Sequence, residues 1–148
     1  TERLITQQPL LSSEFRQLQS QVKTLLKDLS EEWVNSNAPL VAVAGTPTTV
    51  AALEIEMGVY DGHRIHGYFL TLEVMEKWCD KLMKMTVNER SRLNGMDPLR
   101  ADVIVAGLVI LIESVKLSGV SGVYVSDRGV RYGLALRGSL DGQTGEIN

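Results

Sequence analysis

Apolar residues recur at steps of three and four along the first part of the chain, which predicts a helix with one apolar stripe. Ser12 or Ser13 is expected to cap its first turn, and Glu14 suits the positive end of its dipole. Pro39 ends the pattern. The stripe consists of Phe15, Leu18, Val22, Leu25, Leu26, Leu29 and Trp33.

A short apolar run followed at once by Gly and Thr residues predicts a strand, a tight turn and a helix. The strand is expected at residues 40–44, and its unbroken apolar character is typical of a strand buried on both faces. Thr46 and Pro47 stand where a helix start favours a capping hydroxyl and a proline. The helix should then continue to about Met57 and stop at Gly58.

The middle of the chain is predicted to be mostly helical. Residues 59–69 are interpreted as a loop or a small hairpin, after which Thr71 is expected to cap a helix that continues through Met85. Thr86 and Glu89 have the spacing of a capping box and predict a short further helix.

A long apolar segment follows and predicts a helix at the centre of the fold. Asp97 and Pro98 should open it, and residues 101–112 are apolar almost all round, which is typical of a helix buried by its neighbours.

A second strand–turn–helix unit is predicted near the end of the chain. The strand is expected at residues 120–125 and the helix at residues 130–137. Residues 1–137 therefore form the folded part, and the polar, Gly-rich residues 138–148 are expected to be a flexible tail. Together these elements indicate an α/β fold that is rich in helices and has short buried strands.

Composition and charge narrow the class of protein. The chain has 148 residues, 44% of them hydrophobic and 22% charged, which is enough for one packed domain. A net charge of -3 provides no basic excess for a nucleic-acid partner. The single Cys79 excludes a disulfide framework and suggests a reducing compartment such as the cytoplasm. The longest apolar run, 103–112, is too short to span a membrane. The chain has no signal peptide and begins at Thr1 without an initiating Met, so we expect a piece of a longer protein.

The turn at residues 45–49 is the first candidate for chemistry. Gly45 permits close approach of the backbone, and the hydroxyls of Thr46, Thr48 and Thr49 could donate to phosphate or sugar oxygens, next to the free N–H groups of a helix start. The turn lacks the Lys of a phosphate-binding Walker loop. The competing interpretation is that Gly and Thr serve only turn geometry and helix capping.

Several charged residues are candidates for the same cleft, and each has a structural alternative. Arg100 and Asp102 flank the start of the apolar helix, where they either line a cleft or simply pair with each other. Arg128 and Arg131, at the second turn, would meet a phosphate or remain solvated.

The remaining reactive side chains point to no catalytic or metal centre. His63 and His66 have no matching metal ligands and are interpreted as loop or packing residues, and Cys79 as a core residue. The five glutamates assigned to helices leave no carboxylate at a strand end, where this architecture would place a general base. These glutamates are Glu54, Glu56, Glu73, Glu89 and Glu113. The residues alone therefore predict a ligand-binding half-site without a catalytic group.

Five sequence segments in this order resemble the exopolyphosphatase and guanosine pentaphosphate phosphohydrolase (Ppx/GppA) family. The resemblance covers about residues 1–136, and the stretch at 95–107 carries it most specifically. The segments are GTPTTVAALE (45–54), HGYFLT (66–71), MTVNER (85–90), GMDPLRADVIVAG (95–107) and VSDRGVRYGL (125–134).

The resemblance implies a fold and an activity. The family's catalytic module has two ribonuclease-H-like domains of the actin and sugar-kinase type, and this chain resembles the later part of the second domain. The implied reaction is Mg²⁺-assisted removal of a terminal phosphate from polyphosphate or guanosine pentaphosphate by attack of water. The family's phosphate loops and catalytic glutamate would precede Thr1, so the chain alone is expected to be inactive and to need the missing first domain as its partner.

Site residues are carried over from the family by matching motifs. Pro47 replaces a more usual small residue, and Tyr132 stands where the family often has an acid, which puts any role of that acid in doubt. The resemblance implies substrate-binding positions at Gly45, Thr46, Thr48, Arg100, Asp102, Ser126, Gly129 and Arg131, with no metal ligand among them.

Two other classes of function remain open at this point. The chain could be a non-catalytic module of the same fold that binds a nucleotide or a partner and regulates. It could instead be an interaction domain that acts through exposed apolar surface. Because missing strands would leave a sheet edge uncovered, we expect a homodimer or other self-association under any of these hypotheses.

Overall fold

A small mixed sheet organises the molecule, whose computed structural model describes residues 5, 8–27 and 38–143. The sheet has three strands in the order β1-β3-β2, and β3 pairs parallel with β1 and antiparallel with β2. Their bounds are β1 Val41–Val43, β2 Phe69–Thr71 and β3 Gly122–Ser126. Because β1 and β3 are parallel neighbours, the turns that follow them lie at the same edge of the sheet.

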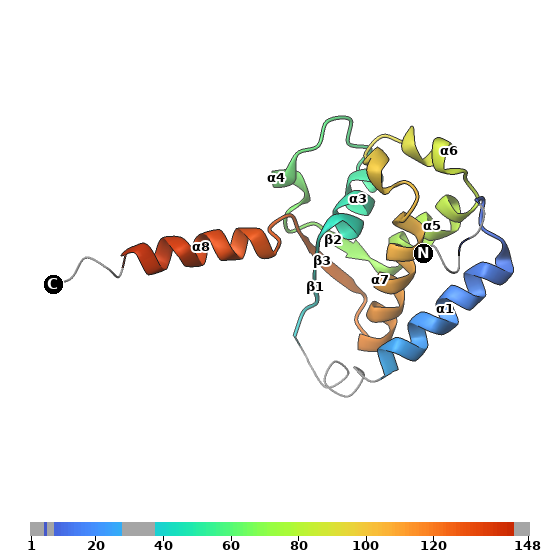
Figure 1. Ribbon diagram of the computed structural model, residues 1–148, viewed down its shortest axis with the longest axis horizontal. Helices are drawn as coiled ribbons and strands as arrows, with labels where there is room; N and C mark the ends of the chain where they lie inside the picture. The colour runs from blue at the N-terminus through green and yellow to red at the C-terminus, as the bar shows by residue number, and fades with distance from the viewer. Residues whose placement is uncertain (1–4, 6–7, 28–37, 144–148) are drawn as a thin grey trace.

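Helices cover one face of this sheet, and one helix projects away from it (Figure 1). Helix α3 packs on β1 and β3, α5 packs on β2, and α7 contacts α3, α5 and α1. The bounds are α1 Ser12–Leu26, α3 Gly45–Glu54, α4 Gly62–Ile65, α5 Leu72–Met83, α6 Val87–Ser91, the 3₁₀ helix η2 Pro98–Arg100, α7 Ile104–Ser118 and α8 Val130–Gln143. The expected helix-rich α/β class is confirmed.

The hydrophobic core lies between the sheet and these helices, with α7 at its centre. Most apolar side chains of α7 are buried, as an element that is apolar almost all round requires. The predicted start at Asp97 and Pro98 belongs to the separate turn η2, where the Asp97 carboxylate accepts the Leu99 N–H at 3.0 Å. Cys79 is buried in this core, as predicted.

The prediction that the first strand is buried on both faces is wrong. Val41 is 60% exposed and Val43 44%, on the sheet face that the helices do not cover. Phe69 and Tyr124 occupy the same face, with ring centroids 5.0 Å apart. The apolar sequence of β1 therefore does not require that both faces of the strand be buried.

Local capping predictions are confirmed at two helices and wrong at two others. Thr71 accepts the Val74 N–H at 3.2 Å, and Thr86 and Glu89 form the capping box. At α1 the helix already includes Ser12, so neither serine caps it. Helix α3 begins at Gly45, one residue before the expected cap at Thr46, and ends at Glu54.

Two segments differ from the sequence-based expectations in length or type. Residues 59–69 contain the short helix α4 and end in β2, a strand formed only because β3 lies beside it. Helix α8 continues to Gln143, past the expected boundary at residue 137, and residues 144–148 lie outside the described part. Leu29 and Trp33 of the predicted first helix also lie outside it. None of the helices that the structure describes is long and apolar enough to cross a membrane.

Candidate functional site

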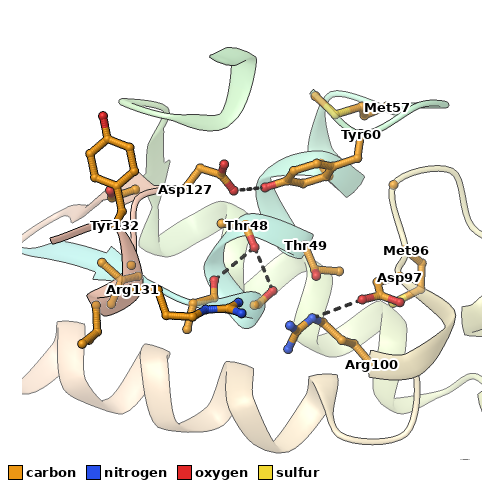
Figure 2. A pocket seen from close by; sticks show the side chains of 18 of the residues that line it. Thr48, Thr49, Met57, Tyr60, Met96, Asp97, Arg100, Asp127, Arg131 and Tyr132 are labelled. Carbon is orange, nitrogen blue, oxygen red and sulfur yellow. Dashed lines mark hydrogen bonds and ion pairs between the residues drawn. The ribbon is translucent and has the colours of Figure 1, made fainter. Parts of the chain in front are cut away.

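A pocket of about 1150 Å³ opens where the turns after β1 and β3 meet (Figure 2). One wall is the start of α3, another is the turn from β3 into α8, and the loops at residues 57–60 and 95–100 complete it. The volume suffices for a nucleotide-sized ligand. The pocket therefore lies at the edge of the sheet that the two strand–turn–helix units predicted.

Six of the eight sequence-predicted site residues line this pocket, namely Gly45, Thr48, Arg100, Ser126, Gly129 and Arg131. Thr46 does not, because its side chain lies against Gly107 of α7, in the space that a Cβ at Gly107 would occupy. Asp102 does not either. It is exposed beyond the end of η2, and its backbone carbonyl accepts a hydrogen bond from Gln8 at 3.3 Å.

The start of α3 presents backbone N–H groups to the pocket. Ala44 precedes the helix with φ 76° and ψ −170°, a conformation that is almost confined to glycine and that stores strain. Ala44 has no side-chain oxygen with which to cap the helix. Thr48 Oγ instead donates to the carbonyls of Ala44 and Gly45, at 3.0 and 3.1 Å. The positive end of α3 thus remains available to an anion.

Arg100 lies directly against the backbone of Gly45. A Cβ at position 45 would collide with the guanidinium group, so only glycine permits this approach. Arg100 Nε pairs with Asp97 Oδ2 at 3.4 Å, not with Asp102 as the structural alternative proposed. Figure 2 shows Arg100 on one side of the start of α3 and Arg131 on the other.

Asp127 and Tyr60 are pocket residues that the sequence analysis missed. Asp127 follows β3 directly, so the prediction that no carboxylate stands at a strand end is wrong. The Tyr60 hydroxyl donates a hydrogen bond to the Asp127 carboxylate (Figure 2). Burial, this hydrogen bond and the charge of Asp127 raise the pKa of Tyr60 to about 12. The hydroxyl therefore stays protonated at neutral pH.

Ser126 and the two histidines lie at the same edge of the sheet. Ser126 Oγ accepts the Arg128 N–H at 3.1 Å and lies 3.3 Å from His66 Nδ1. The His63 N–H donates to Asp61 at 2.9 Å. Within the described residues, no three His, Cys, Asp or Glu side chains are grouped closely enough to hold a metal ion.

The lining of the pocket combines balanced charge with apolar surface. Arg100 and Arg131 offset Asp97 and Asp127. The apolar and aromatic part consists of Val43, Ala44, Ala52, Met57, Met96, Val130, Tyr60 and Tyr132. The arginines and the start of α3 supply positive charge and the two tyrosines supply rings, which suits an anionic ligand with a ring or an apolar portion.

The chain belongs to the Ppx/GppA phosphatase family, whose family model matches residues 1–141. It is 36% identical over 118 residues to a bifunctional 3-dehydroquinate synthase/phosphatase of Fusobacterium nucleatum, and this match covers 79% of this chain and 17% of that protein. It is 31% identical over 123 residues to exopolyphosphatase 2 of Mycobacterium tuberculosis, which covers 80% of this chain and 36% of that protein.

Solved structures share the fold. The Aquifex aeolicus member of the Ppx/GppA family superimposes with a TM-score of 0.85 at 31% identity, covering 95% of this chain and 45% of that one. An exopolyphosphatase from Cytophaga hutchinsonii, 22% identical with a TM-score of 0.78, shows the same fold. The fold expected from the family resemblance is thus confirmed, and the chain spans less than half the length of these relatives.

Proposed function

We propose that this chain forms one wall of the active site of a phosphohydrolase that removes terminal phosphate from polyphosphate or guanosine pentaphosphate. The observation that carries the proposal is the junction of Arg100 with the backbone of Gly45 at the start of α3, with Arg131 opposite. Backbone N–H groups and guanidinium groups around one point are what a phosphate group requires. Family membership supports the reaction class.

In this proposal the pocket residues either bind phosphate oxygens or hold the turns whose groups bind them. The first N–H groups of α3 donate to phosphate oxygens, and Arg100 and Arg131 balance the charge of the phosphate chain. Thr48 acts indirectly: its hydrogen bonds to the carbonyls of Ala44 and Gly45 hold the turn whose N–H groups bind. Ser126 and Gly129 shape the opposite turn.

The Mg²⁺ ion expected from the resemblance fits one carboxylate of the pocket. Mg²⁺ is commonly held by one or two carboxylates together with substrate phosphates and water. Asp127 would supply one such oxygen, since Tyr60 engages only its Oδ1 and the residue lines the pocket. Bound there, the ion would neutralise charge on the phosphate chain.

No residue of the pocket is proposed as the general base, which we assign to a first domain that completes the cleft. We propose that this chain is the later part of the second domain and is inactive alone. The extent of the related structures supports this division, because the chain covers 45% of the Aquifex aeolicus protein. The cytoplasm remains a prediction and rests on the free, buried Cys79.

The composition of the pocket favours the nucleotide over bare polyphosphate. Asp97 would repel a uniformly anionic chain, whereas the hydroxyl and amino groups of a nucleoside could donate hydrogen bonds to its carboxylate. Tyr60 and Tyr132 provide rings on which a base could stack. We therefore expect a guanosine polyphosphate to bind more tightly than tripolyphosphate.

A chimera tests the proposal. This chain would replace the matching 45% of the Aquifex aeolicus family member, and phosphate release would be measured from polyphosphate and from guanosine pentaphosphate with Mg²⁺. We expect turnover by the chimera and none by this chain alone, and Arg100→Ala should abolish it. A folded chimera that binds either substrate without turnover would support the alternative, a regulatory binding module. Turnover by this chain alone would refute the assignment of the general base to the first domain.

Self-association is the remaining proposal, and solution mass tests it. The uncovered sheet face that carries Val41, Phe69 and Tyr124 supports a homodimer. Light scattering should report at least twice the mass of 16.3 kDa at micromolar concentration, and a monomer would contradict the expectation.

A further inference from the structure

Arg90 in α6 is a fully buried arginine that forms no direct ion pair within the described residues, although the charge of Asp102 acts on it at longer range. In the described part of the chain no Asp or Glu lies within ion-pair distance of it. Its Nε instead donates to the Leu82 carbonyl at 2.7 Å, and its Nη1 donates to the Ala101 carbonyl at 3.0 Å. Nη1 also donates to the Gln8 side chain, and Nη2 has no partner among these residues. A buried charge without a direct ion pair is costly, so its position requires a reason.

The two carbonyls that Arg90 binds stand at the ends of two different elements. Leu82 lies in the last turn of α5, and Ala101 directly follows η2. Carbonyls at helix ends carry the negative partial charge of the helix, and the Leu82 carbonyl also accepts the Met85 N–H at 3.1 Å. A planar guanidinium donates in two fixed directions at once, which an ammonium group on a flexible stem does not do. Arg90 therefore joins the end of α5 to the end of η2.

The turn that Arg90 holds carries a pocket residue. Ala101 is fully buried, and the preceding Arg100 donates its backbone N–H to the Asp97 carbonyl at 2.9 Å while its side chain lies against Gly45. We propose that Arg90 is a positioning residue for phosphate binding: it fixes the turn at residues 97–101 so that the Arg100 guanidinium keeps its place at the start of α3. This inference rests on the proposed function, because it assigns Arg100 to the phosphate.

A double-mutant cycle tests the inference. Affinity for inorganic tripolyphosphate would be measured by calorimetry for Arg90→Met and Arg90→Lys, each in the wild-type chain and in an Arg100→Ala chain. We expect both Arg90 variants to weaken binding about tenfold in the wild-type chain and not at all in the Arg100→Ala chain. A role in stability alone would lower the melting temperature equally in both chains without this dependence on Arg100.

A neighbouring arginine provides the control for the loss of a positive charge. Arg92→Met changes an exposed arginine two residues away and should leave binding unchanged. Equal loss of affinity in both backgrounds, or wild-type affinity in a folded Arg90 variant, would overturn the inference. Arg90→Lys keeps the charge and serves if Arg90→Met does not fold.

A separate readout distinguishes failure of this inference from failure of the proposed function. If the wild-type chain binds no tripolyphosphate, the proposed function fails, and amide hydrogen exchange then decides whether Arg90 holds the turn. The amides of Ala101 and Val103, which bond to the Pro98 and Arg100 carbonyls, should exchange about tenfold faster in Arg90→Lys, relative to amides of the α7 core. Unchanged relative exchange at these two amides would show that Arg90 does not hold the turn.

Discussion

Replacing Gly45 with alanine should separate ligand binding from stability in this protein. The added Cβ would occupy the position of the Arg100 guanidinium, so that side chain must move away from the start of α3. The obstacle is the far end of a flexible, half-exposed side chain and not backbone, so the fold itself need not change. The substitution therefore acts on the site and hardly on the core.

Gly45→Ala should raise the stability of the fold and weaken the binding of phosphate. Alanine in place of glycine in the first turn of α3 should raise the free energy of unfolding by up to about 1 kcal/mol, because the unfolded chain loses conformational freedom. A charge-assisted hydrogen bond contributes about 1.5–3 kcal/mol. If Arg100 binds phosphate from its present position, its displacement should weaken binding by about 10- to 150-fold.

Urea denaturation and calorimetry with tripolyphosphate would measure these two quantities. Gly58→Ala is the matched control, because Gly58 also lines the pocket but a Cβ there would meet no atom within 4 Å. We expect it to bind as the wild type does. Undiminished affinity of Gly45→Ala, or an equal loss in Gly58→Ala, would refute the assignment of Arg100 to the phosphate.

Three further predictions follow from the geometry. Titration followed by tyrosine NMR should give Tyr60 a pKa of about 12, and Asp127→Asn should lower this pKa toward about 10, so an unchanged pKa in the variant would contradict the pair. The stability that the neutral Tyr60 hydroxyl contributes is present below about pH 10 and is lost as the pH rises through about 12. Ala44→Gly should raise the free energy of unfolding in urea by about 1 kcal/mol, because it relieves a strained backbone conformation, and a loss of stability would show that the strain is absent. Leu108→Ala should lower the free energy of unfolding by about 2–5 kcal/mol in the same assay, because Leu108 is fully buried, and Leu134→Ala, at an exposed position on α8, should lower it far less. Similar losses in the two variants would place Leu134 in a packed interface.

The sequence by itself determined the features whose causes are local. Thr71 caps α5, and Thr86 with Glu89 caps α6, because a cap needs only a side chain and a backbone N–H three residues apart. The apolar character of residues 101–112 predicted a buried helix, which the structure places at Ile104–Ser118, because a run of apolar side chains is a property of the local chain. The two strand–turn–helix units were also visible, and with them the edge of the sheet where the pocket lies.

Tertiary structure alone decided which side chains meet at that edge. Thr46 has the chemistry of a ligand-binding residue, but the close approach of α7 at Gly107 directs it into the fold. Asp127 and Tyr60 are 67 residues apart, and only the placement of the loop at residues 57–60 beside β3 joins them. Arg100 pairs with Asp97 and not with Asp102, because the turn η2 brings the side chains of Asp97 and Arg100 together. Periodicity and capping depend on neighbours along the chain, whereas pairing, exposure and direction of side chains depend on elements that the local sequence does not encode.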